Sequence, residues 1–148
     1  MKLSTKGHYG VRLMIDLASH YWEGPVLLRE ISEREEISEK YLWHLINPLK
    51  AAGLVTATRG AHGGYILAKP PFQITMKEIL QVLEGNMCLV DCVEKPSTCN
   101  RVPGCSARDM WSEIADGIDR ILTTTTLADM AERQKTKREK RASVNYMI

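Results

Sequence analysis

The sequence of 148 residues is poor in aromatic side chains and contains no long apolar run. Phe, Trp and Tyr together make up 6% of the chain, and only one of these residues is Phe. No segment approaches the roughly 20 apolar residues of a membrane-spanning helix. The opening MKLSTKGHYG also lacks the basic-then-apolar order of a signal peptide. We therefore expect a cytoplasmic protein that makes no contact with a membrane.

Arrangements typical of enzymes are also lacking. No nucleophile stands beside a base, and no pair of carboxylates has a setting typical of acid–base catalysis, so we expect no enzymatic activity. Hydrophobic residues still make up 44% of the chain, which is enough for a folded core. The length suits one compact domain of roughly 100 to 200 residues, or one domain with an appended segment.

Acidic residues are absent from one long internal segment. Between Glu39 and Glu78 the chain has no Asp or Glu. The cations of this segment are Lys40, Lys50, Arg59, Lys69 and Lys77. A second basic segment, residues 133–141, has six Lys or Arg against one Glu. The small net charge of +2 therefore conceals two basic segments, and a surface without carboxylates suits a partner that carries phosphates.

Three helices are predicted in the N-terminal third of the chain. Apolar residues recur at helical spacing over residues 6–21 and again from about residue 27. Ser38 is a good N-cap for a third helix that runs toward residue 52. Pro48 removes a hydrogen bond inside that helix, so we expect a kink or a break near Asn47.

A β-hairpin is predicted next, because strand-like runs at residues 54–58 and 65–68 flank a glycine-rich loop. A capping box from Thr75 to Glu78 begins the following helix, and Gly85 ends it. Ser106 is the expected cap of a later, long helix, which four Thr at residues 123–126 weaken. Thr126 is the expected cap of a short last helix.

Helix, turn, helix and hairpin in this order predict a winged helix-turn-helix, a mainly α fold with a small β-hairpin wing. We expect a DNA-binding domain at residues 1–85 and a cysteine-bearing loop at residues 86–106. A long dimerisation helix and the short terminal helix are expected at residues 107–131. Residues 132–148 are expected to form a basic, disordered tail.

Double-stranded DNA suits such a unit, because an α-helix fits the major groove and a hairpin beside it reaches the backbone. A glycine-rich hairpin alone is more often a plain turn, and a basic run alone is more often a solvated face. Their combination with a capped helix and with the absence of carboxylates from Lys40 to Lys77 favours DNA. The glycines are expected to let the backbone approach phosphates. The predicted DNA contacts are Ser38, Lys40, Tyr41, His44, Arg59, Gly60, His62, Gly63 and Gly64.

Five segments follow one another in an order that one known family shares. They are LSTKGHYGVRLMIDLA, REISEREEISEKYL, PLKAAGLVTATRGAHGGYILA, ITMKEILQVLEG, and three spaced Cys before a Trp-bearing helix. On these segments the chain resembles the IscR/NsrR-type (Rrf-type) winged-helix transcription regulators. The resemblance implies a regulator, expected to be a repressor, whose DNA affinity or choice of site depends on a [2Fe–2S] or [4Fe–4S] cluster.

Cluster ligation falls on three of the four Cys in this resemblance. Cys92, Cys99 and Cys105 are spaced as Cys-x6-Cys-x5-Cys, in a segment irregular enough to fold around a cluster. Structural zinc usually requires a tight Cys pair, and only Cys88-x3-Cys92 qualifies. Zinc and a thiol redox switch stay open as alternatives. The alternative function is a cluster-free regulator that senses through Cys oxidation or through a bound partner protein.

The fourth cluster ligand departs from the best-known family patterns, since no His follows Cys105 closely. His8 stands where other relatives supply a ligand from near the N-terminus, and the resemblance implies it as the fourth ligand, provided by the partner subunit. An exposed His or a phosphate contact is the alternative. Cys88 is left as a buried apolar side chain or a resolving thiol.

The operator cannot be inferred from relatives that have Glu-Gln after the Tyr-Leu of the third helix. Trp43 and His44 stand there in this chain, and Trp cannot accept a hydrogen bond from cytosine as a carboxylate does. Packing against the wing or the first helix is the alternative role for Trp43.

The long helix carries an apolar seam that suits pairing with a second copy. The predicted dimer interface consists of Trp111, Ile114, Ile118, Ile121 and Leu122. Pairing would hold two recognition helices roughly 34–36 Å apart, which matches a palindromic operator. Packing within the chain itself is the alternative role of the seam.

Overall fold

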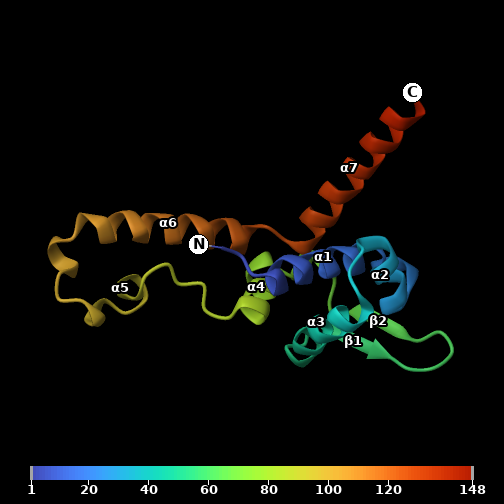
Figure 1. Cartoon of the computed structure of the whole chain (residues 1–148), viewed down its shortest axis with the longest axis horizontal. Coiled ribbons are helices and arrows are strands. Elements are labelled where there is room, and N and C mark those ends of the chain that lie inside the picture. The colour runs from blue at the N-terminus through green and yellow to red at the C-terminus, as the bar shows by residue number, and fades with distance from the viewer. Residues whose placement is uncertain (1, 148) are drawn as a thin grey trace.

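The computed structural model describes residues 2–147, and Figure 1 shows the arrangement of its helices and strands. The longer elements are α1 (Thr5–Ser19), α2 (Leu28–Glu35), α3 (Glu39–Ala51), β1 (Val55–Thr58), β2 (Gly64–Leu67), α4 (Met76–Glu84), α5 (Asp91–Glu94), α6 (Ser106–Thr124) and α7 (Leu127–Tyr146). Short 3₁₀ turns cover Tyr21–Glu23, Pro71–Gln73, Pro96–Thr98 and Val102–Gly104. This order confirms the predicted mainly α fold with a two-stranded wing.

One hydrophobic core holds α1 to α4 and the hairpin together. Most apolar residues at helical spacing in α1 to α4 turn inward, and Leu13, Leu42, Ile46 and Ile79 are completely buried. Each such side chain stabilises the fold by about 1.5–3 kcal/mol relative to an exposed one. The winged helix-turn-helix therefore rests on a core that extends from α1 to the first turn of α7.

The wing is an antiparallel hairpin in which Val55 pairs with Leu67 and Thr58 pairs with Gly64. A third extended segment extends the hairpin, because Val26 and Tyr65 exchange two backbone hydrogen bonds of 2.9 and 2.8 Å. A Cβ at Gly64 would lie 2.6 Å from the backbone oxygen of Val26. Glycine at this position is therefore required by the close approach of the two backbones.

Pro48 does not break α3, contrary to the sequence prediction. The helix continues from Glu39 to Ala51 with Pro48 inside it. Leu45, Ile46 and Leu49 are at most 1% exposed, so core packing before and after the proline holds the helix together. That packing outweighs the missing hydrogen bond.

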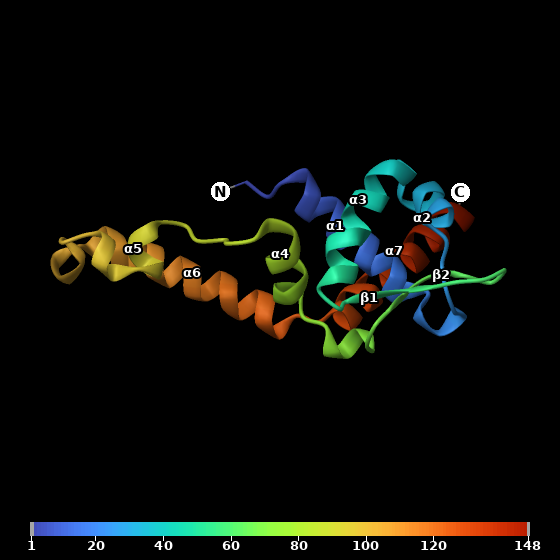
Figure 2. The ribbon, with the colours of Figure 1, turned by 90° about the horizontal axis from the view of Figure 1, so that it is seen from below.

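Helix α6 and the cysteine-bearing residues 86–105 form an arm that extends away from the winged domain, as Figures 1 and 2 show. The arm is tied to the domain at its base. The N–H of Met76 donates to the oxygen of Thr125 (2.9 Å), and the N–H of Leu127 donates to that of Ile74 (2.8 Å). Leu127 is fully buried at this junction.

The caps of these helices follow the sequence in all but one instance. The Ser38 and Thr75 hydroxyls accept from the N–H groups of Tyr41 and Glu78, as expected. At α6, however, Cys105 occupies the N-cap position and Ser106 is the first helical residue.

In residues 2–147 there is no helix that is long and apolar enough to cross a membrane.

The C-terminal segment differs most from its prediction. Residues 132–146, expected to be a disordered tail, continue α7 as a helix to Tyr146, and residue 148 lies outside the described residues. Thr126 and Asp129 form a capping box at the start of this helix, and the hydrogen bonds from Thr126 lower the pKa of Asp129. The residues that follow in α7 include many Glu, Gln, Lys and Arg, and these residue types favour helix.

Candidate nucleic-acid interface and cysteine segment

The exposed side of α3 presents three of the residues predicted to bind DNA. Lys40 and His44 are exposed on the first turns of the helix, and Ser38 is exposed at its N-cap. The Ser38 hydroxyl already accepts a hydrogen bond of 3.2 Å from the N–H of Tyr41. Its proton is left to donate to an anion at the helix N-terminus, where the helix dipole favours negative charge.

Tyr41 is half-buried and packs into the domain, unlike the other predicted contacts on α3. Its ring meets Tyr9 of α1 edge to face, with the ring centroids 5.8 Å apart. Trp43 behaves in the opposite way, since it is 52% exposed and stands beside His44 with ring centroids 5.5 Å apart. The alternative that Trp43 packs against the wing or α1 is therefore wrong for this structure.

The tip of the wing is a cationic, carboxylate-free loop. Arg59, Gly60 and His62 are all exposed. Gly60 has a φ of 105°, a backbone conformation that favours glycine. Gly63 is half-buried, and a Cβ there would lie 2.4 Å from the oxygen of Thr58. Gly63 is thus explained by a contact inside the hairpin and Gly64 by the close backbone of Val26, so phosphate approach is not needed to explain either glycine.

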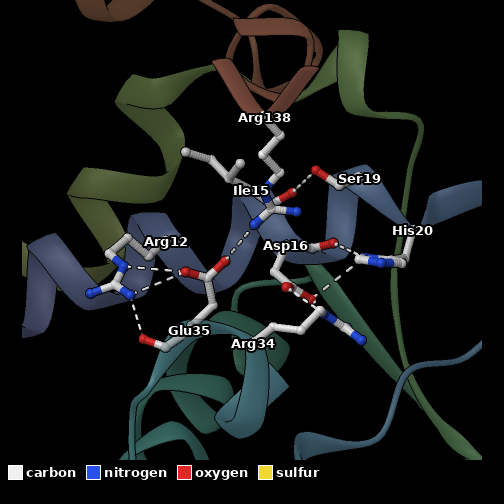
Figure 3. Close-up of polar contacts among 8 residues, drawn as sticks. All are labelled: Arg12, Ile15, Asp16, Ser19, His20, Arg34, Glu35 and Arg138. Atoms are coloured by element: carbon white, nitrogen blue, oxygen red, sulfur yellow. Dashed lines mark hydrogen bonds and ion pairs between the residues drawn. The ribbon is translucent and has the colours of Figure 1, made fainter. Parts of the chain in front are cut away.

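A buried ion pair fixes α2, the first helix of the helix-turn-helix, against α1. Asp16 is 1% exposed, and Arg34 donates to both of its carboxylate oxygens, at 2.9 and 2.8 Å (Figure 3). The hydrogen bond to Asp16 raises the pKa of Arg34 above its ordinary value, although burial opposes this. Nδ1 of His20 lies 2.8 Å from the backbone oxygen of Asp16 and 3.6 Å from Oδ1.

A second cluster of charges holds the turn between α2 and α3. Glu35 accepts from Arg12 of α1 through its carboxylate, at 3.3 and 3.1 Å, and through its backbone oxygen. Arg138 of α7 approaches the other carboxylate oxygen at 3.5 Å (Figure 3). Glu36 follows in the left-handed conformation, with a φ of 56°. This turn sets how α3 is presented, and α1 and α7 both contact it.

The base of the wing is joined to α4 by one exposed ion pair. Lys69 donates to Glu78 at 2.9 Å, while the N–H of Thr75 donates to the other oxygen of Glu78 at 2.8 Å. Burial alone would raise the pKa of Glu78, but the hydrogen bonds from Thr75 and Lys69 outweigh it and lower that pKa. Glu78 of the capping box therefore also binds the segment that follows the second strand of the wing.

The cysteine segment does not form a metal site in this arrangement. Cys88, Cys92, Cys99 and Cys105 are all half-buried free thiols. Among residues 2–147, no three His, Cys, Asp or Glu side chains lie close enough together to hold a metal ion. The predicted triad of Cys92, Cys99 and Cys105 therefore stands in one segment without converging, and its placement does not fit a bound cluster.

His8, the predicted fourth ligand, is exposed on α1 in the winged domain. Its ring lies 5.4 Å from that of Tyr9, and no metal-holding group includes it in the described part of the chain. The structure therefore does not bring His8 to the cysteines of its own chain. Cys88 lines a pocket of about 410 Å³ between α4 and α6, and its thiol donates to the oxygen of Val90.

The predicted dimer seam of α6 is largely unpartnered within the chain. Trp111, Ile118 and Ile121 are 41%, 36% and 62% exposed, whereas Ile114 is half-buried. Leu122 differs, since it packs against the core of its own chain. Met110, which lies outside the predicted interface, is 51% exposed and extends the apolar face. Only the amphipathic spacing of the helix could have indicated it.

Comparison with known proteins agrees with this architecture. Residues 3–133 match the Rrf2 family, described as "Iron-dependent Transcriptional regulator". The HTH-type transcriptional regulator CymR of Bacillus subtilis is 42% identical over 131 residues, which cover 88% of this chain and 90% of that protein.

Two solved structures have the same fold. That of CymR (YrzC), described as the global cysteine regulator of B. subtilis, has a TM-score of 0.79 and 41% identity, and the match covers 90% of this chain and 98% of that one. That of T. potens IscR has a TM-score of 0.74 and 42% identity, covering 90% of this chain and 88% of that one. The chain therefore belongs to the Rrf2 family of transcription regulators.

Proposed function

We propose that the protein is a cytoplasmic, homodimeric regulator that binds a palindromic operator through α3 and the wing, and that residues 86–105 control this binding. The observation that carries the proposal is the exposed, carboxylate-free surface from Lys40 to the tip of the wing. Lys40, His44, Arg59 and His62 supply donors to phosphates and base edges from two elements held rigidly on one core.

Trp43 adds an apolar contact to this surface. A large aromatic that is half-exposed beside His44 suits the methyl group of thymine better than the donors and acceptors of a G·C pair. The operator is accordingly proposed to carry thymine in each half-site.

Dimerisation rests on the exposed apolar face of α6. Trp111, Ile118 and Ile121 lie on a helix that projects from the domain, and a contiguous apolar patch of this kind marks an interaction site. Pairing of this face with itself about a two-fold axis repeats the same surface on both copies, which is the symmetry that a palindromic operator requires.

Cysteine chemistry is the proposed source of control, and two forms of it compete. The family description "Iron-dependent" and the similarity to IscR favour iron–sulfur binding by Cys92, Cys99 and Cys105. Such a cluster supplies thiolate-bound iron whose loss or oxidation is a signal. The similarity to CymR of Staphylococcus aureus, one structure of which is described as an oxidized form, and the four free thiols of this chain favour Cys oxidation without a cluster. Because the thiols do not converge, the first form requires the segment to rearrange.

DNA binding is tested by selecting duplexes from a randomised pool and footprinting the protein on a selected duplex. Two protected half-sites related by a dyad are expected, with an affinity that falls steeply with salt. Failure to enrich any sequence, or a single asymmetric protected patch, would overturn the proposal.

Control by the cysteines is tested by absorption spectra of protein purified without oxygen and reconstituted with iron and sulfide. Colour that disappears in Cys92→Ala, Cys99→Ala and Cys105→Ala, and persists in Cys88→Ala, assigns cluster binding. Colour retained in His8→Ala removes His8 from the ligand set. A colourless product whose DNA affinity changes with thiol oxidation assigns the cluster-free form.

A further inference from the structure

Residues 133–141 of α7 carry an excess of positive charge, and Asp129, one turn before Arg133, is the acidic residue whose pKa is lowered by the capping hydrogen bonds and then by this cation. Residues 133–141 contain six Lys or Arg and one Glu. Arg138 pairs with Glu35 at 3.5 Å, and it is the one cation of this segment in an ion pair within the described part of the chain. The remaining five are all exposed: Arg133, Lys135, Lys137, Lys140 and Arg141.

Four of these cations share one side of the helix. Arg133, Lys137, Lys140 and Arg141 follow one another at steps of four, three and one residues, which places them on neighbouring positions of an α-helix. Like charges at this spacing repel one another, so the surface is stabilised when a dense anion covers it. At 1.5 Å per residue the four cations extend over about 12 Å, comparable with the distance between a few phosphates of a nucleic-acid strand.

Helix α1 separates this surface from the recognition helix. Figure 1 shows α7 on one side of α1 and the hairpin with α3 on the other. Helix α1 packs against α7, α3 and β2, which fits this order of elements. Helix α7 therefore lies on the side of α1 opposite to α3 and the hairpin. Because the family match ends at residue 133, Lys137, Lys140 and Arg141 also lie beyond the residues that the family model matches.

We propose that the basic face of α7, formed by Arg133, Lys137, Lys140 and Arg141, is a second DNA-binding surface that holds a duplex segment different from the one bound by α3. This surface contacts phosphates and does not recognise the base sequence, because the ammonium groups of Lys and the guanidinium groups of Arg bind the phosphates of the DNA backbone. One protein dimer then joins an operator to another stretch of DNA. The inference rests on the proposed function, because α3 must hold the first duplex.

A two-duplex retention assay tests this directly. A duplex obtained by selection is fixed to beads and saturated with protein, and a labelled duplex of unrelated random sequence is then added. The variant is Lys137→Gln, Lys140→Gln and Arg141→Gln together, because Gln favours helix and removes only charge. The matched control is Lys2→Gln, Lys6→Gln and Arg120→Gln, three exposed cations outside α3, the wing and residues 86–105.

The wild type and the control are expected to retain the second duplex, with a slope of log affinity against log salt of about −3 to −4 for four phosphate contacts. The α7 variant is expected to bind the first duplex normally and to lose at least about two-thirds of that slope for the second. Equal retention by the variant, or none by the wild type, overturns the inference. Retention of labelled poly-glutamate in place of the second duplex assigns the face to an acidic protein and also overturns it.

A failure of the proposed function gives a different result. In that case the wild type does not bind the first duplex, and the variant Lys40→Ala with His44→Ala behaves as the wild type does. Circular dichroism measures the helix content of the α7 variant, and a helix content equal to that of the wild type excludes loss of folding as the cause.

Discussion

The ion pair between Asp16 and Arg34 gives a prediction whose two halves differ in size. The Asp16 side chain is 0% exposed, whereas that of Arg34 is 31% exposed. Arg34→Met leaves a carboxylate buried without its guanidinium, which costs about 3–5 kcal/mol. Asp16→Asn leaves a guanidinium that can turn toward water, and this costs about 1–2 kcal/mol. We therefore expect Arg34→Met to be the more damaging substitution.

A double variant distinguishes the loss of the attraction between Asp16 and Arg34 from the cost of leaving one buried charge unpaired. Asp16→Leu combined with Arg34→Met removes both charges and fills the site with apolar atoms. Replacement of a buried ion pair in this way is often neutral or stabilising. The free energy of unfolding of the double variant is therefore expected to exceed that of Arg34→Met alone by about 2 kcal/mol or more.

Urea unfolding at one fixed protein concentration measures these differences, because a dimer's stability depends on concentration. With a slope of about 2 kcal/mol per molar urea, Arg34→Met should lower the midpoint by about 2 M and Asp16→Asn by under about 1 M. If Asp16→Asn lowers the midpoint more, or if the double variant is no better than Arg34→Met, then burial of the carboxylate does not control the stability of this pair.

Three further predictions concern the core, pH and assembly. Leu45 is 1% exposed, so Leu45→Ala should lower the free energy of unfolding in urea by about 2–5 kcal/mol, whereas His44→Ala should change it by no more than about 0.5 kcal/mol. Equal urea midpoints for the two variants would contradict the assigned faces of α3. The folded-state pKa of Glu78 is lowered, so the contribution of Glu78 to stability is complete above the ordinary carboxyl pKa and is lost as pH falls through the folded value. Below about pH 5 the urea midpoint of Glu78→Gln should therefore fall less steeply with decreasing pH than that of the wild type. An equally steep fall in both proteins would refute this. Ile121→Asp should convert dimer to folded monomer in analytical ultracentrifugation while Arg120→Asp should not; a dimeric Ile121→Asp would remove the α6 face from the interface.

Local signals in the sequence were sufficient to predict the winged fold. Ser38, Thr75 and Thr126 each precede a helix and accept the hydrogen bond that their residue type predicts. The glycine-rich loop between two short apolar runs likewise predicts the hairpin. Such signals depend on residues that are close together in the sequence, so they can be recognised without knowledge of any tertiary contact.

Features that depend on distant partners were not predictable. Asp16 and Arg34 are 18 residues apart, and the only sign of their pairing is a carboxylate inside the apolar run of α1. Pro48 is tolerated because Leu45 and Leu49 are buried against other helices. Tyr41 was expected at DNA but packs on Tyr9, a contact between α3 and α1.

Charge composition misled the prediction for the C-terminal segment. Residues 132–146 are rich in Lys and Arg, which is typical of a solvated tail, yet the same residues favour helix once Thr126 has capped one. The start of α7 then packs on the core through Leu127. The spacing of the cysteines predicts which thiols could act together but not whether they converge, since this depends on how residues 86–105 fold.

The affinity of a selected duplex for the recognition-helix variant tests the central claim most directly. Lys40→Ala with His44→Ala should weaken binding by about 2 kcal/mol or more, roughly 30-fold, and lower the salt slope by about 0.9 for each phosphate that the variant no longer binds. The control Arg120→Ala, on α6, should bind as the wild type does. A recognition-helix variant that binds with unchanged affinity and salt dependence would contradict the account, because α3 would then not be the surface that contacts DNA.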